Sequence, residues 1–146
     1  MDDWFSKRRI SLETSLTLNK NHKRELIEHA KKCAPNESCA LLFGKESSGT
    51  YTVMDVFLTK NTEDSPINFT ISNEDLLRGY KDAEQKKLDV IGIFHSHPHS
   101  DAFPSATDKK FMEINPVIWL IFSNKSDELA AYVLDHKVKP VHVTIS

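Results

Sequence analysis

The stretch from Ile91 to Asp108, "IGIFHSHPHSDAFPSATD", passes from an apolar run into a segment rich in histidine, aspartate, serine and proline. A short apolar run of this kind is typical of a buried strand. Residues two apart on a strand point to the same face, so His95 and His97 should project together while Ser96 points away. Pro98 cannot donate to the ladder and should end the pairing. This pattern leaves two alternatives, a polar surface loop or a metal site at a strand end.

Two imidazoles side by side are costly to bury, because neutral rings need hydrogen-bond partners and charged rings repel each other. A metal ion removes both problems. Catalytic zinc sites typically have three protein ligands plus a water molecule. We favour Asp108 as the third ligand, in the first turn of a following helix. Asp101 and His99 are rivals in the loop, but a loop residue is less rigidly aimed than a residue at a helix start.

Ser105 and Asp108 also have an explanation that needs no metal. The segment "SATD" has the pattern of a capping box, with Ser105 as the N-cap and an acidic residue three positions later. The two roles are compatible, because a serine at a helix start presents its hydroxyl in a field that favours negative charge.

Hydrophobic periodicity and turn residues predict the elements around this stretch. The chain should begin with a strand at 8–18, with Ile10 and Leu12 on its apolar side, and a helix capped by Asn19 or Asn21 and stopped by Pro35. A strand at 38–44, a turn at 44–49 and an antiparallel strand at 50–59 should follow, and then a strand or extended link at 66–72 and a helix capped by Ser72. The last elements should be the strand at 89–94, a helix from Ser105 to before Pro116, and strands at 116–123, 128–135 and 138–146.

This order predicts the α/β class: a mixed, curved β-sheet flanked by helices, and not a barrel or sandwich of strands alone. The sequence contains no internal repeat, low-complexity tract or linker rich in proline and glycine. We therefore expect a single domain over residues 1–146.

Composition excludes several classes of function. Of the 146 residues, 39% are hydrophobic and 27% are charged, as in soluble globular proteins. The net charge of -2 provides no field for nucleic acid or an anionic membrane. The basic runs at 7–9 and 20–24 are flanked by acidic residues, which indicates solvated mixed-charge surfaces. We therefore predict no nucleic-acid or membrane partner.

The N-terminal segment "MDDWFSKRRI" has no apolar signal region, and no stretch reaches the roughly 18 apolar residues that span a bilayer. A cytoplasmic location is therefore expected. Cys33 and Cys39 form neither a disulfide framework nor a structural zinc set. We expect buried or incidental thiols, with a Cys33–Cys39 bridge as the open alternative.

Taken together, these residues resemble the JAMM (MPN+) metalloprotease family, whose signature is H-S-H-x7-S-x2-D. Residues 95–108 have this spacing, and "PNESCALLFG" at 35–44 resembles the glutamate-bearing segment of the family. The resemblance extends from about Ile10 to about Asp135. It implies an MPN (cytidine deaminase-like) domain. The implied site has His95, His97 and Asp108 as zinc ligands, Glu37 as the general acid/base for the zinc water, and Ser105 as an oxyanion donor.

Two positions depart from the family pattern. Ala40 stands where relatives often have glycine in E-x-C-G, and His99 stands where many have an acidic or small residue, which leaves a supporting or alternate-ligand role for His99 open. The other histidines match no position of the signature and are expected to be surface or hydrogen-bonded structural residues; they are His22, His29, His136 and His142.

Small archaeal and bacterial members of the family are similar in size to this chain. The resemblance to them implies a zinc isopeptidase that removes ubiquitin-like or sulfur-carrier modifiers after a Gly-Gly tail from lysine or another amine. The tail would add to a sheet edge as an extended strand, in a cleft bordered by 98–104 and 59–69. A homodimer is left open.

Two rival hypotheses are a non-catalytic scaffold of the same fold and a DNA-repair-associated relative with a similar H-x-H-P pattern. A scaffold would normally have lost a ligand or the glutamate. The DNA-repair pattern favours asparagine at Ser96, and an acidic chain is poorly suited to DNA.

Overall fold

The computed structural model describes residues 14–146. Within this range the chain forms three helices and seven strands. Their bounds are β1 Ser15–Leu18, α2 Lys20–Cys33, β2 Cys39–Ser47, β3 Thr50–Thr59, α3 Asn73–Gln85, β4 Asp89–His97, α4 Ala106–Ile114, β5 Ile118–Ser123, β6 Leu129–Asp135 and β7 Lys137–Ile145. The predicted order of elements is confirmed. Segment 66–72 is a link that makes one isolated bridge, from Ile71 to Asn61, and Ile10 and Leu12 lie outside the described residues.

The mixed α/β class with flanking helices is confirmed, but the strands form a closed barrel in the order β1-β3-β2-β4-β5-β6-β7 and not the curved sheet that we expected. Closure depends on β1, which pairs in parallel with both β3 and β7. Leu16 and Leu18 on one face of β1 are fully buried. A strand this short therefore covers two sheet edges that would otherwise present unpaired backbone groups.

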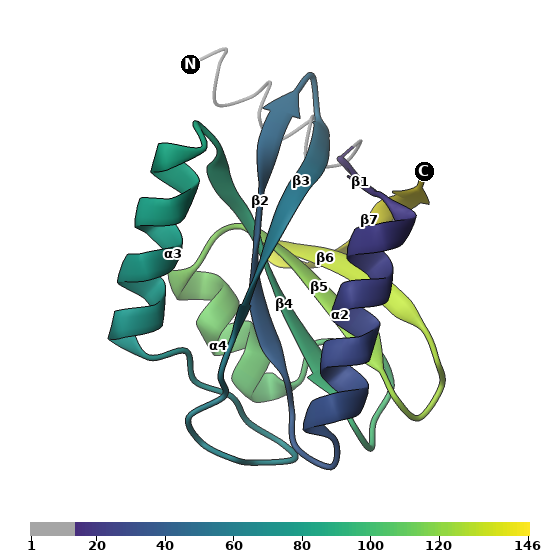
Figure 1. Cartoon of the computed structure of the whole chain (residues 1–146). Coiled ribbons are helices and arrows are strands. Elements are labelled where there is room, and N and C mark those ends of the chain that lie inside the picture. Colours follow the sequence, from purple (N-terminus) through teal and green to yellow (C-terminus); the bar gives the residue numbers. More distant parts are fainter. Residues whose placement is uncertain (1–13) are drawn as a thin grey trace.

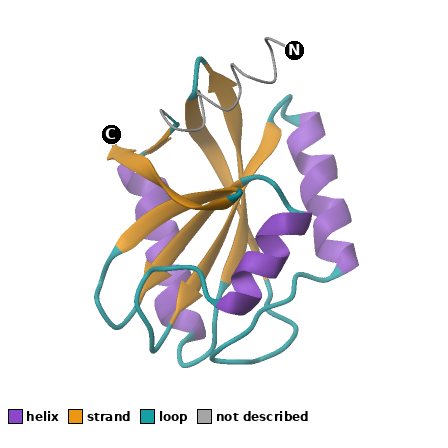
Figure 2. Cartoon of the chain, turned by 180° about the vertical axis from the view of Figure 1, so that it is seen from behind, coloured by secondary structure: helices purple, strands orange, loops and turns teal. Residues whose placement is uncertain are grey.

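The central strands β2 and β4 are buried on both faces, which explains their unbroken apolar runs. Along β2, Ala40 and Leu42 join the core that includes Leu26 of α2. Leu41 and Phe43 point the other way, into a second core under α3 and α4. Figure 1 shows α2 on one side of these strands and α3 on the other, and Figure 2 shows α4 from behind.

The predicted helix caps are confirmed for two helices. The Asn19 side chain accepts a hydrogen bond from the backbone N–H of His22 at 2.7 Å, and the Ser72 hydroxyl accepts one from Asp75 at 3.1 Å. The hairpin turn is tighter than predicted: β2 continues to Ser47, and Ser48 and Gly49 make the turn with φ of 50° and 85°. Two consecutive positive φ values match the right-handed twist of the flanking strands.

Several segments converge at one end of the barrel, at the bottom of Figure 1. There α2 ends, β2 begins, β4 ends, and the loops 60–72 and 98–105 lie close by.

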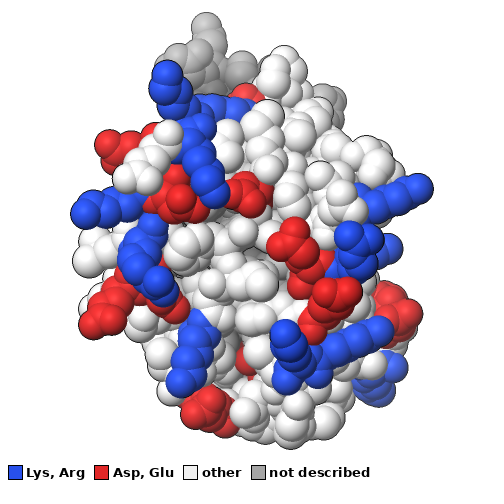
Figure 3. All heavy atoms as spheres, viewed as in Figure 1, with Lys and Arg blue, Asp and Glu red and all other residues white. Residues whose placement is uncertain are grey.

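Basic and acidic side chains intermix over α2 and α3 on the face in Figure 3. None of the helices in residues 14–146 is both long and apolar enough to cross a membrane.

Candidate metal centre

Three buried side chains meet at the end of β4, and they are the ones that the sequence singled out. His95 and His97 extend from β4, and Asp108 lies in the first turn of α4. The two histidine Nε2 atoms are 3.1 Å apart, and they lie 3.1 Å and 3.0 Å from Asp108 Oδ2. The three residues are between 0% and 3% exposed. A nearly equilateral triangle of two ring nitrogens and a carboxylate oxygen is thus enclosed by protein.

This triangle fits a tetrahedral cation. Zinc–nitrogen bonds of about 2.0–2.1 Å place neighbouring ligand atoms of a tetrahedron about 3.3 Å apart, close to the spacing found here. Within residues 14–146, these three residues form a group whose candidate ligand atoms lie within 4.8 Å of one another. Donors of two nitrogens and one oxygen match the composition of catalytic zinc sites.

The His97 ring is oriented by the loop that follows β4. Its Nδ1 donates to the backbone carbonyl of Asp101 at 2.8 Å, so in the neutral ring the lone pair lies on Nε2 and points into the centre. The Asp101 side chain is 74% exposed and lies 4.0 Å from Lys125 Nζ. His99 is also exposed. The loop therefore contributes a carbonyl to the site, and the side chains of Asp101 and His99 remain outside it.

Ser105 and Asp108 form the capping box that their spacing predicts. The Ser105 hydroxyl accepts from the Asp108 N–H at 3.0 Å, and Asp108 Oδ2 accepts from the Ser105 N–H at 2.9 Å. Burial alone would raise the pKa of Asp108, but hydrogen bonds from His95 and His97 outweigh burial and hold the pKa far below its usual range. Asp108 is thus a carboxylate, and the exposed Ser105 hydroxyl keeps its own proton available for donation.

Glu37 lies just before β2 and is 3% exposed. Cys39 pairs with His95, and Ser96 N–H donates to Ser38 O at 3.1 Å; continuing this register places Glu37 opposite His97. Burial raises the pKa of Glu37 to about 8, partly offset by the charge of His97. Glu37 Oε1 is buried and has no hydrogen-bond partner within residues 14–146. A buried carboxyl beside the triangle, with one oxygen unpaired, is suited to exchanging a proton with a bound molecule.

Two aromatic rings pack against the His95 ring, and the sequence pattern did not predict this contact. Phe69 stacks on the His95 ring with centroids 4.8 Å apart, and Trp119 meets the same ring edge-on at 5.6 Å. Burial in this apolar setting lowers the pKa of His95. "PINFTIS" marked Phe69 as part of an extended segment, but no periodic signal assigns an isolated aromatic residue to a distant histidine.

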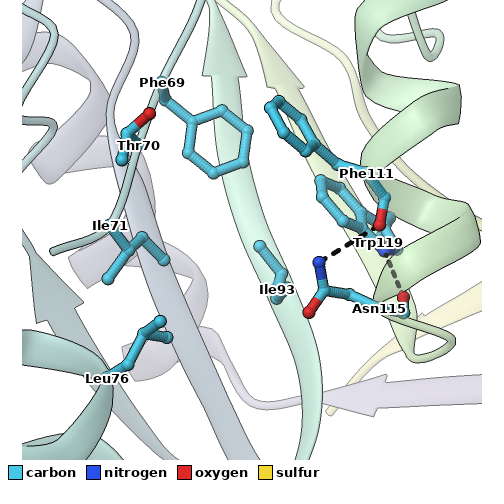
Figure 4. A pocket seen from close by; sticks show the side chains of 8 residues that line it. All are labelled: Phe69, Thr70, Ile71, Leu76, Ile93, Phe111, Asn115 and Trp119. Atoms are coloured by element: carbon cyan, nitrogen blue, oxygen red, sulfur yellow. Dashed lines mark hydrogen bonds between the residues drawn. The ribbon is translucent and has the colours of Figure 1, made fainter. Parts of the chain in front are cut away.

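Phe69 and Trp119 also line a pocket of about 170 Å³ between α3 and α4 (Figure 4). Its apolar walls include Ile71, Leu76, Ile93 and Phe111. Trp119 Nε1 donates to Asn115 O at 3.1 Å, which fixes the indole at the pocket wall. The pocket therefore adjoins the back of the His95 ring and can take an apolar group.

The remaining histidines and the cysteines lie outside the centre. His29 Nε2 bridges the carbonyl oxygens of Cys39 and Thr59 at 3.0 and 3.1 Å, a satisfied structural role. His136 and His142 are exposed, whereas His22 is half-buried and its Nδ1 has no partner within residues 14–146. Cys33 and Cys39 are both free thiols, so the alternative of a bridge between them is not realised.

Comparison with known proteins gives a consistent result. Residues 19–135 match the family of prokaryotic homologs of the JAB domain. The chain is 40% identical over 109 residues to a desampylase of Pyrococcus furiosus, covering 75% of this chain and 74% of the relative. It is 28% identical over 124 residues to the CysO-cysteine peptidase of Mycobacterium tuberculosis, covering 81% and 84%.

The fold has a solved counterpart in a protein of Desulfitobacterium hafniense. Its solution structure superimposes with a TM-score of 0.81 at 29% identity, covering 90% of this chain and 92% of the other. The family match extends over the centre, the Glu37 segment and most of the barrel. The chain therefore belongs to the JAB domain family and is a hydrolase of its JAMM (MPN+) metalloprotease branch.

Proposed function

We propose that the chain is a zinc-dependent isopeptidase. It would remove ubiquitin-like or sulfur-carrier modifiers after a Gly-Gly tail from lysine or another amine. The observation that carries this proposal is the enclosed triangle of His95, His97 and Asp108 beside the buried carboxyl of Glu37. The named substrates of the similar proteins support the substrate class, because one relative is a desampylase and another is a CysO-cysteine peptidase.

In this proposal, His95, His97 and Asp108 hold the zinc. The ion, when bound, supplies Lewis-acid polarisation of the scissile carbonyl and lowers the pKa of a water molecule. The Asp101 carbonyl keeps the His97 lone pair aimed at the centre. The capping box holds the Asp108 carboxylate through the Ser105 N–H. Each ligand is thus fixed by a partner of its own or by ring stacking.

Glu37 acts as the general acid/base. Its carboxylate accepts a proton from the attacking water, and the resulting acid donates that proton to the departing amine. The raised pKa of Glu37, about 8, favours this exchange near neutral pH, because neither protonation state is strongly disfavoured. Burial keeps the carboxyl away from bulk water.

Ser105 donates its hydroxyl hydrogen to the oxyanion that develops on the scissile carbonyl. The hydroxyl oxygen already accepts a hydrogen bond from the Asp108 N–H, which holds the side chain in one orientation. A donor fixed in advance stabilises the developing charge without reorganisation during the reaction.

The proposal is tested by incubating the purified protein with conjugates that join a ubiquitin-like modifier to lysine through a Gly-Gly tail. We expect cleavage of at least one conjugate, loss of cleavage with a chelator, and recovery on addition of zinc. A non-catalytic scaffold predicts no cleavage in any arm. Cleavage that survives complete removal of metal would overturn the proposed mechanism.

A further inference from the structure

Asn61 lies two residues after the end of β3 and is 6% exposed. Its side-chain amide makes four hydrogen bonds. Nδ2 donates to the backbone carbonyls of Glu37 at 3.0 Å and Asn68 at 2.9 Å. Oδ1 accepts from the backbone N–H groups of Glu63 at 3.0 Å and Thr70 at 3.1 Å. Because two carbonyls face the NH₂ and two N–H groups face the oxygen, the partners define how the amide is oriented.

One of these four bonds differs from the others in what it connects. The bonds to Glu63, Asn68 and Thr70 stay within the loop that follows β3. The bond to Glu37 O leaves the loop and reaches the segment before β2, 24 residues earlier in the chain. The loop is closed by the other three bonds, so the bond to Glu37 O serves to connect the loop to the segment before β2.

The consequence of this connection is the placement of Glu37. The Glu37 N–H donates to Ser65 O at 2.8 Å, so loop 61–70 holds this residue by both its N–H and its carbonyl. Within residues 14–146, no side-chain hydrogen bond aims the Glu37 carboxyl, and Oε1 is buried without a partner. The direction of the carboxyl therefore depends on the backbone of Glu37. Asn61 holds the carbonyl group of that backbone.

Asn61 also acts on the other side of the centre. Its partners Asn68 and Thr70 flank Phe69, whose ring stacks on His95. A single buried amide thus connects the proton-transfer residue with the ring that backs a proposed metal ligand.

We propose that Asn61 is a positioning residue for the hydrolysis, which holds the Glu37 carboxyl in register with the metal centre. The inference rests on the proposed role of Glu37 as general acid/base. Misplacing a catalytic group by about 1 Å can cost on the order of 100-fold in rate. Loss of the Asn61 bond should therefore appear in kcat and leave substrate binding nearly unchanged.

The test is a double-mutant cycle of Asn61→Ala and Glu37→Gln, measured by steady-state cleavage of a Gly-Gly-linked conjugate over a range of substrate concentrations. Alone, Asn61→Ala should lower kcat by roughly 10–100-fold, with little change in KM or bound zinc. In the Glu37→Gln background the same change should alter the rate by no more than about twofold, because the carboxyl that it positions is gone.

Two further variants test the donor at position 61 and the loop around it. Asn61→Asp keeps the oxygen that accepts from Glu63 and Thr70 but loses the donor to both Glu37 O and Asn68 O, so it should lower kcat together with the melting temperature. Asn68→Ala is the matched control, because Asn68 contributes only backbone atoms to these hydrogen bonds. It should retain wild-type kcat.

The outcomes distinguish this inference from the proposed function. If Glu37→Gln alone keeps full turnover, the proposed role of Glu37 is wrong and the inference fails with it. If Glu37→Gln is impaired but Asn61→Ala lowers the rate by the same factor in both backgrounds, only the inference fails. A wild-type kcat for Asn61→Asp would likewise overturn the positioning role.

Discussion

Replacing Glu37 with glutamine should stabilise the metal-free protein, and the gain should grow with pH. Glutamine has nearly the same shape and volume as glutamate but carries no titratable group. Glu37 is 3% exposed, and burial raises its pKa from 4.5 to about 8. The substitution therefore removes a carboxyl that the folded chain keeps protonated and the unfolded chain ionises.

The sign follows from proton linkage. Between pH 4.5 and about 8 the unfolded chain releases the Glu37 proton while the folded chain retains it. Raising the pH through this window therefore favours unfolding of the wild type, and the effect is absent in the glutamine variant. Each unit of pKa difference corresponds to about 1.4 kcal/mol. We expect the variant to gain on the order of 2–4 kcal/mol relative to wild type from pH 4.5 to pH 8.

Urea unfolding followed by tryptophan fluorescence, with chelator present, measures this difference at pH 4.5, 6 and 8. Glu113→Gln is the control, because it removes the same charge from an exposed site on α4. A flat difference, or a variant that loses stability as pH rises, would refute the account of Glu37 as a buried, protonated carboxyl in the metal-free protein.

The same variant tests the chemistry once zinc is restored. Zinc content should be nearly unchanged, and turnover should fall by roughly 10²–10⁴-fold, the usual contribution of general acid–base catalysis. Loss of zinc together with activity would mean that Glu37 is a ligand or a structural support.

The other predictions address the ligands, the cap and the aromatic backing. Metal analysis after dialysis should find about one zinc per chain; Asp108→Ala should empty the site, whereas Asp101→Ala should not, and the opposite ranking would mean that the wrong aspartate is assigned. Ser105→Ala should slow turnover by about 10²–10³-fold and lower the free energy of unfolding by about 1 kcal/mol; normal turnover in kinetic assays would leave only the capping role. Phe69→Ala, at a residue 6% exposed, should cost about 3–5 kcal/mol in urea unfolding and weaken zinc retention. Wild-type stability of this variant would contradict the packing of Phe69 on His95.

Much of the local structure could be predicted from the sequence because its signals are local. The helix caps at Asn19, Ser72 and Ser105 depend on side chains within three residues of the groups they bond. Successive side chains alternate between the two faces of any strand, so the common direction of His95 and His97 followed from their spacing of two residues alone. The grouping of Asp108 with these histidines followed from the position of a helix start.

Closure of the barrel could not be predicted in this way. It depends on β1 pairing with β7, which lies at the opposite end of the chain. The four residues of β1 carry too little pattern to specify two neighbours, and local periodicity does not say which strands pair. The pairing of β1 with β7 can form only once the chain has brought both sheet edges together.

The sequence by itself determined the order of the elements, the two histidines on one face of β4, and the carboxylates at Glu37 and Asp108. Only the tertiary structure decided what orients them: the Asp101 carbonyl on His97, the Phe69 ring on His95, and the Asn61 amide on the backbone of Glu37. The first of these contacts uses a backbone atom that every residue possesses, and the other two join segments 24 or more residues apart. Residue identity reveals which chemistry a chain can perform, but contacts of this kind exist only after long-range packing has brought the segments together.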